Sequence, residues 1–97
     1  MLKLGRLTGA WFYDLACVAA LCGPTARADL ARPLPWRERF AERAARQAIA
    51  WLHEAHKAGF FKSQATRDHM SKDTDLDSLR GRADFKAFVA GLAMKDR

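Results

Sequence analysis

Two features are almost missing from this sequence: cysteine and the alternating pattern of a β-strand. Only Cys17 and Cys22 occur, too few for the disulfide framework of a small secreted protein. Five residues apart in one expected helix, they point about 140° apart and would not bridge. Reduced thiols favour the cytoplasm.

No run alternates Val, Ile or Thr, so the fold class is predicted to be all-α.

A membrane-spanning stretch is missing as well. The apolar run from Trp11 to Leu21 is too short to cross a bilayer, so no membrane partner is expected. A signal peptide over residues 1–28 stays open as an alternative, because Lys3 and Arg6 precede the run and Ala26-Arg27-Ala28 resembles a cleavage site. The chain would then be a small secreted or periplasmic helical protein. Asp14 argues against it, since insertion would bury a charge in the membrane.

Acidic residues are outnumbered. The chain has 17 Lys and Arg against 11 Asp and Glu, a net charge of +6. Such a charge favours an acidic partner or an anionic surface. The alternative of a basic nucleic-acid-binding helical protein is disfavoured by the interleaved Glu38 and Glu42, which are typical of a solvated helix face. Most of the excess lies in six arginines: Arg27, Arg32, Arg37, Arg39, Arg43 and Arg46.

Apolar residues recur every three or four positions in two long stretches, which predicts two helices. The first, over residues 4–22, is expected to bury two adjacent stripes: Leu4, Leu7, Trp11, Leu15, Val18 and Cys22, then Phe12, Ala16 and Ala19. Gly23-Pro24 is expected to end it. Residues 24–35 then form a Pro-rich connection. The second helix, over residues 36–58, is expected to bury six residues: Phe40, Ala44, Ala48, Trp51, Leu52 and Ala55.

The remaining chain is predicted to cap the two long helices. Gly59 is predicted to end the second helix, and Ser63 to be the N-cap of a short third one. A single helical turn then starts at Thr74 or Asp75, Gly81 breaks it, and a last helix runs from residue 83 to residue 94. Residues 63–94 are therefore interpreted as capping helices, and residues 1–97 as one helical domain.

No metal, cofactor or catalytic residue is expected. Four aspartates follow the spacing of a calcium loop: Asp73, Asp75, Asp77 and Asp84. Ser78 stands where that loop needs glycine, and Arg80 where it needs an apolar residue, so a packed cap is favoured. His53 and His56 could join Cys17 and Cys22 at zinc, but the two cysteines point apart. No base or oxyanion site accompanies Cys17, so the chain is predicted not to be an enzyme.

Three segments resemble parts of a tetratricopeptide-repeat array. The segment Tyr13-Asp14-Leu15-Ala16-Cys17-Val18-Ala19-Ala20-Leu21 resembles the first helix of a bacterial repeat of the Tyr-Asn-Leu-Ala-Cys type. Ala48, Leu52 and Ala55 match the small–large–small signature of the second helix. The tail, from residue 58 onward, is similar to the segment that closes the repeat region of bacterial eukaryotic-like serine/threonine protein kinases. This similarity is carried by Ala58-Gly59-Phe60-Phe61, Asp73-Thr74-Asp75-Leu76-Asp77-Ser78-Leu79-Arg80 and Phe85-Lys86-Ala87-Phe88. The Gly-rich loop, His-Arg-Asp and Asp-Phe-Gly of a kinase domain are lacking, and the Pro-rich connection is longer than such repeats have.

The resemblance implies a scaffold that binds a protein or peptide on the concave surface lined by the first helices. Ala10, Tyr13, Cys17 and Ala20 would line that surface, with Tyr13 as the anchor. In the alternative, Tyr13 and Cys17 pack against a neighbouring repeat or the Pro-rich connection. Because one hairpin cannot bury both of its faces, Leu4, Leu7 and Trp11 are expected to meet a partner or to drive self-association.

Overall fold

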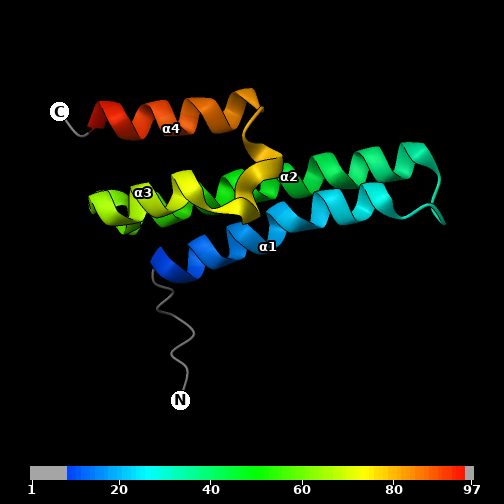
Figure 1. Ribbon diagram of the computed structural model, residues 1–97, viewed down its shortest axis with the longest axis horizontal. Helices are drawn as coiled ribbons and strands as arrows, with labels where there is room; N and C mark the ends of the chain where they lie inside the picture. The colour runs from blue at the N-terminus through cyan, green and yellow to red at the C-terminus, as the bar shows by residue number, and fades with distance from the viewer. Residues whose placement is uncertain (1–8, 96–97) are drawn as a thin grey trace, which may run out of the picture.

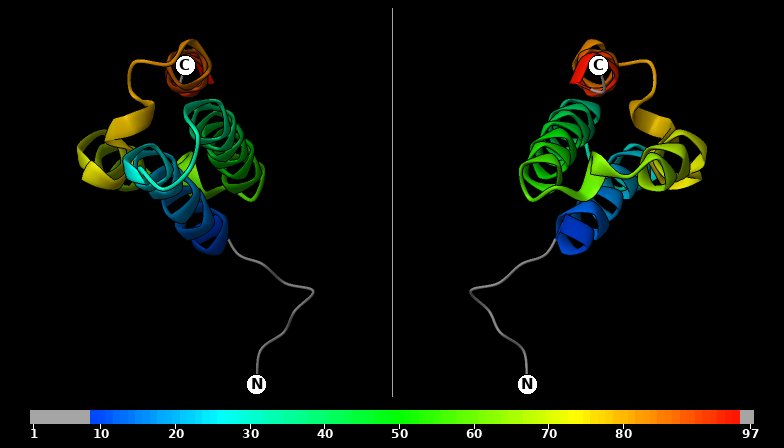
Figure 2. Two further views of the ribbon diagram at one scale, coloured as in Figure 1. Left: turned by 90° about the vertical axis from the view of Figure 1, so that its right-hand side faces the viewer. Right: turned by 90° about the vertical axis from the view of Figure 1, so that its left-hand side faces the viewer.

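A computed structural model describes residues 9–95, and within that range the chain is all-α, as predicted. Two long helices, α1 (Gly9–Ala28) and α2 (Leu34–Lys57), form an antiparallel hairpin (Figure 1). The tail adds the 3₁₀ segment η1 (Phe60–Lys62), helix α3 (Gln64–Lys72), the 3₁₀ segment η2 (Thr74–Leu79) and helix α4 (Ala83–Lys95). In the tail, η2 contacts α1 and α4 contacts α2 (Figure 2).

The predicted end of the first helix at Gly23-Pro24 is wrong, because α1 continues to Ala28. Proline has no N–H to donate to the carbonyl four residues earlier, which normally breaks a helix. Here that carbonyl belongs to Ala20, and the hydroxyl of Ser78 donates to it at 3.0 Å. A side chain from the tail thus replaces the backbone donor that proline lacks.

This hydrogen bond can be tested with a double-mutant cycle. Ser78→Ala should lower the free energy of unfolding by about 0.5–1.5 kcal/mol, because the Ala20 carbonyl loses its donor. In a Pro24→Ala background the backbone N–H of residue 24 can donate instead, so the same substitution should cost less. Urea denaturation followed by circular dichroism measures both losses. Equal losses in the two backgrounds would contradict this explanation.

The connection between the long helices is short, covering residues 29–33 in place of the predicted 24–35. Arg37 holds it from the first turns of α2, donating to the carbonyls of Arg32 and Arg27, each at 3.0 Å. Pro33 precedes α2 in an extended conformation, and Pro35 lies in the first turn of the helix, where proline is tolerated. Two of the three prolines therefore position the start of α2.

The predicted buried face of α1 is wrong in part. Leu4 and Leu7 lie outside the described residues, while Trp11 and Val18 are exposed. The helix buries mainly small side chains: Ala16, Cys17, Ala20 and Gly23, with Tyr13. On α2, Ala48, Leu52 and Ala55 are fully buried as predicted, but Phe40 is exposed. Small residues on both helices let the backbones approach closely, and this close packing decided which faces meet.

The predicted boundaries of the tail are confirmed to within two residues. Gly59 adopts a left-handed conformation with φ 90° after α2, which glycine does without strain. The Ser63 hydroxyl accepts a hydrogen bond from the Ala65 N–H at 3.1 Å. Gly9 allows the tail to come close, since a Cβ there would lie 2.6 Å from the Cβ of Phe60. The tail contributes seven residues to the core: Phe61, Met70, Leu76, Leu79, Phe85, Phe88 and Leu92.

Candidate functional site

Three of the four residues predicted to bind a partner are buried by the chain's own tail. Tyr13, Cys17 and Ala20 are 4%, 8% and 1% exposed, and only Ala10 is exposed to solvent. The ring of Tyr13 stacks on that of Phe60 with centroids 5.0 Å apart. The alternative of internal packing therefore holds for Tyr13 and Cys17, but the covering segment is the tail and not the Pro-rich connection. A peptide would reach these three side chains only by displacing the tail.

Asp73 connects the tail to α1 through its side chain. Its Oδ2 accepts hydrogen bonds from the Tyr13 hydroxyl at 2.7 Å and from the Cys17 Sγ at 3.6 Å. Its Oδ1 accepts from the Asp75 N–H at 3.0 Å and so caps η2. The Nε2 of His69 lies 3.3 Å from Oδ2. One carboxylate thus joins α1, α3 and η2.

Burial and hydrogen bonding in this cluster keep the Cys17 thiol and the Tyr13 hydroxyl protonated and the Asp73 carboxylate charged. Burial raises the pKa of Asp73, but hydrogen bonds from Tyr13, the Asp75 N–H and Cys17 outweigh it and hold that pKa below 3.8. Burial, followed by the negative charge of Asp73, raises the pKa of Cys17 to about 12. The pKa of Tyr13 is raised for the same reasons, burial first and then its hydrogen bond to Asp73. A thiol with such a pKa stays protonated at neutral pH and is a poor nucleophile.

Three of the residues considered for metal binding contact other side chains. Asp77 pairs with Arg80 at 2.9 Å and Asp84 with Arg82 at 3.0 Å, so the four aspartates do not converge. His53 packs against the ring of Phe88 with centroids 4.8 Å apart. Within residues 9–95, ligand atoms gather within 4.8 Å of one another in one group: Cys17, Asp73 and Asp75. In this group the Asp73 carboxylate caps η2 through the Asp75 N–H and accepts a hydrogen bond from the Cys17 thiol.

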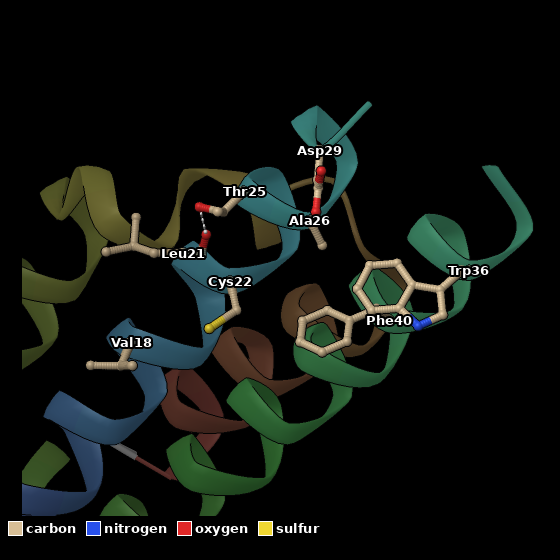
Figure 3. A pocket seen from close by; sticks show the side chains of 8 residues that line it. All are labelled: Val18, Leu21, Cys22, Thr25, Ala26, Asp29, Trp36 and Phe40. Carbon is tan, nitrogen blue, oxygen red and sulfur yellow. Dashed lines mark hydrogen bonds between the residues drawn. The ribbon is translucent and has the colours of Figure 1, made fainter. Parts of the chain in front are cut away.

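An apolar groove lies between the second half of α1 and the first turns of α2, and we call it the α1–α2 groove. It has a volume of about 550 Å³. Figure 3 shows the rings of Trp36 and Phe40 extending from α2 toward Cys22 and Ala26 of α1. Eight residues line it: Val18, Leu21, Cys22, Thr25, Ala26 and Asp29 from the α1 side, with Trp36 and Phe40 from α2.

The large apolar side chains of the groove are open to solvent. Val18 is 61% exposed, Leu21 47% and Phe40 40%. The rings of Trp36 and Phe40 stack with centroids 5.1 Å apart, and the guanidinium of Arg32 lies 4.9 Å from the centre of the Trp36 ring. Aromatic side chains held in place beside a hollow are typical of protein-binding surfaces.

The groove was not predicted because helical spacing assigned Val18, Cys22 and Phe40 to the core. A signal was present in the sequence. Trp36 and Phe40 stand four residues apart among arginines, so they share one face of a helix whose surroundings are strongly charged. An apolar pair in that setting is better suited to a binding surface than to a core.

The arginines predicted to form a basic cluster are partly paired. Arg46 and Arg82 both bind Glu42, Arg82 with two hydrogen bonds of 2.8 and 3.0 Å. The hydrogen bond from Arg82 is the main reason why the pKa of Glu42 falls to about 2. Glu38 lies 3.9 Å from Arg27. The interleaved glutamates therefore neutralise part of the cluster, as expected for a solvated face.

None of the helices within residues 9–95 is both long and apolar enough to cross a membrane. Comparison of the chain with protein-family models, with curated proteins and with solved structures found no match.

Proposed function

We propose that this protein is a non-enzymatic module for protein–protein interaction, a tetratricopeptide-like helical hairpin closed by its C-terminal tail. The observation that carries the proposal is the α1–α2 groove, where Val18, Leu21 and Phe40 remain exposed around an apolar hollow of about 550 Å³. Leaving such side chains in water costs free energy that a partner's apolar side chains would recover. The mechanism is scaffolding, in which two rigid helices hold a preformed surface.

The proposed binding surface lies away from the face first expected. Tyr13, Cys17 and Ala20 are covered by the tail, whereas Trp36 and Phe40 are accessible in the groove. Tryptophan, tyrosine and arginine are the side chains most enriched among residues that dominate binding energies, and Arg32 lies over the ring of Trp36. Trp36 replaces Tyr13 as the proposed anchor.

The alternatives fit the geometry less well. Cleavage after residue 28 would remove all of α1 and with it the buried Tyr13, Ala16, Cys17 and Ala20. The free thiols of Cys17 and Cys22 are compatible with the cytoplasm, which we keep as part of the proposal. A nucleic acid would engage arginines but leave the apolar side chains of the groove uncovered. Mass determination of the mature chain would identify cleavage.

Peptide selection tests the proposal without a known partner. A displayed random library of peptides about 16 residues long, roughly four helical turns, is selected on the intact chain. Selected peptides should bind Trp36→Ala/Phe40→Ala at least about tenfold more weakly than the wild type, as expected for anchors of an interface. Fluorescence anisotropy of labelled peptides measures the two affinities.

Trp11→Ala/Val89→Ala is the matched control, because it removes two exposed apolar side chains outside the groove. It should leave the affinity unchanged, and circular dichroism should show both variants folded. A selection that yields no binders, or binders insensitive to the Trp36/Phe40 variant, would refute the proposed function.

A further inference from the structure

The edge of the α1–α2 groove is cationic. Trp36 and Phe40 line the groove and also line a second recess of about 380 Å³, which they share with Arg39 and Arg43. Both pairs are four residues apart on α2, and the arginines follow the aromatic residues by three positions. Residues three or four apart are neighbours on a helix surface. An apolar row and a basic row therefore run side by side along the first half of α2.

These two arginines are not neutralised within the described part of the chain. Arg27 has Glu38 at 3.9 Å, Arg32 has Asp29 at 3.8 Å and Arg46 has Glu42 at 3.0 Å. No carboxylate of residues 9–95 forms an ion pair with Arg39 or Arg43. The Nε of Arg39 makes one long hydrogen bond, 3.4 Å, to the carbonyl of Pro35. Both arginines are exposed, so an incoming anion can reach them.

The one acidic residue that lines the groove, Asp29, already has a hydrogen-bond donor and an ion-pair partner within the chain. The Oδ1 of Asp29 accepts a hydrogen bond from the Ala31 N–H at 3.1 Å, and its Oδ2 lies 3.8 Å from Arg32. Within residues 9–95, Arg39 and Arg43 are therefore charges without a partner carboxylate beside the two rings, on a chain with a net charge of +6. Opposite charge on the partner would speed association and select its orientation.

We propose that the occupant of the α1–α2 groove is an acidic amphipathic helix of another protein, with apolar side chains seated between Cys22 and Phe40 and carboxylates facing Arg39 and Arg43. This inference rests on the proposed function and adds the chemistry of the partner. A helix presents an apolar row and an acidic row at the same three- and four-residue spacing as α2 does. It would cover the exposed rings and neutralise the two arginines in a single docking arrangement.

Other occupants match fewer of these features. A second copy would bring another basic chain to an already basic edge, and like charges there oppose association. An anionic membrane would attract the arginines, but a bilayer surface has no protruding side chain to fill the groove. Nucleic-acid phosphates would pair with the arginines and leave the groove empty. Carboxylates beside apolar side chains complement both rows.

The test uses a peptide that the wild type selects and the Trp36→Ala/Phe40→Ala variant does not. Two versions are synthesised that share its apolar positions and carry either Glu or Gln at the flanking positions. The Glu version should bind the wild type about three- to tenfold more tightly at low salt, as expected for two partly exposed ion pairs. The difference should shrink as ionic strength rises. Fluorescence anisotropy measures the affinities.

Two double variants identify the arginines responsible. Arg39→Glu/Arg43→Glu should abolish or reverse the preference for the Glu version. Lys62→Glu/Lys86→Glu removes the same amount of positive charge from exposed positions outside the groove and should keep the preference. Circular dichroism checks that both remain folded. If the two variants behaved alike, overall charge would explain the preference and the inference would be wrong.

The remaining outcomes separate the inference from the proposed function. Groove-dependent peptides that bind equally well with Glu and Gln would refute the inference and leave the proposed function intact. So would a concentration-dependent dimer in light scattering that Trp36→Ala/Phe40→Ala abolishes, since a second copy would then occupy the groove. Displacement of the Glu peptide by phosphatidylserine vesicles, but not by phosphatidylcholine vesicles, would assign the groove to a membrane. The absence of any groove-dependent peptide would refute both.

Discussion

Phe61→Ala should lower the free energy of unfolding by about 3–5 kcal/mol, the usual loss when a buried phenylalanine is truncated in a core. Phe61 is 2% exposed. The centroid of its ring lies 5.1 Å from that of Phe60, 5.6 Å from that of Phe88 and 6.1 Å from that of Tyr13. From η1 it therefore contacts both α1 and α4. A domain of this size has little more stability than that to lose, so the variant should be largely unfolded near body temperature.

Thermal and urea denaturation followed by circular dichroism measure the loss, which corresponds to a fall in Tm of more than about 12 °C. Phe40→Ala is the matched control. Its ring is 40% exposed in the groove, so the loss should stay below about 1 kcal/mol. Similar losses from the two substitutions would mean that the cluster around Phe61 is not the centre of the core.

The parts of the fold that could be predicted are those determined by nearby residues. Gly59 ends α2, Ser63 caps α3 and Gly81 precedes α4 because the conformation of each depends on a few neighbours in the sequence. The small–large–small set on α2 could be predicted because its spacing alone defines one face. Local rules were sufficient for these elements.

The parts that could not be predicted depend on contacts between distant residues. A local rule ends α1 at Pro24, but Ser78 supplies the missing donor from 58 residues beyond the carbonyl that needs it. Trp11 and Val18 were assigned to the core because they are large and apolar. The helices approach closely, however, so alanines are buried between them and these two side chains are exposed.

Helical spacing also assigned Phe40 to the core, whereas the next residue, Ala41, packs beside Gly23 of α1 and Phe40 stays exposed in the groove. Only the position of Trp36 and Phe40 among arginines indicated the groove in the sequence.

Asp73 is the clearest example of a residue whose role depends on distant partners. The sequence presents it as one of several alternating aspartates, suited to capping a short helix or to binding calcium. In the structure its carboxylate does cap η2, but it also accepts a hydrogen bond from Tyr13, 60 residues away. Its contribution to stability should therefore exceed that of a helix cap alone.

Asp73→Ala should lower the free energy of unfolding by about 2–4 kcal/mol. Loss of the cap accounts for about 1 kcal/mol, and the buried Tyr13 hydroxyl, left without an acceptor, for about 1–3 kcal/mol more. Asp77→Ala is the control, because its exposed carboxylate pairs only with Arg80 in a surface contact. That substitution should cost less than about 1 kcal/mol. Equal losses would mean that the Tyr13–Asp73 contact contributes nothing.

The pH dependence of Asp73→Asn isolates the charge of this carboxylate, because asparagine keeps an acceptor oxygen. The pKa of Asp73 in the folded protein lies below its ordinary value of 3.8, so the unfolded chain binds the proton more readily. The stabilisation is therefore fully present above about pH 4 and is lost as the pH falls through the folded pKa. Glu42 and Asp84, whose pKa values are also lowered, are common to both proteins and cancel in the difference. Urea denaturation between neutral pH and pH 3 should show the wild type more stable than Asp73→Asn at neutral pH, with the gap closing only in acid. A gap that stays constant over this range would mean that the charge of Asp73 does not stabilise the fold.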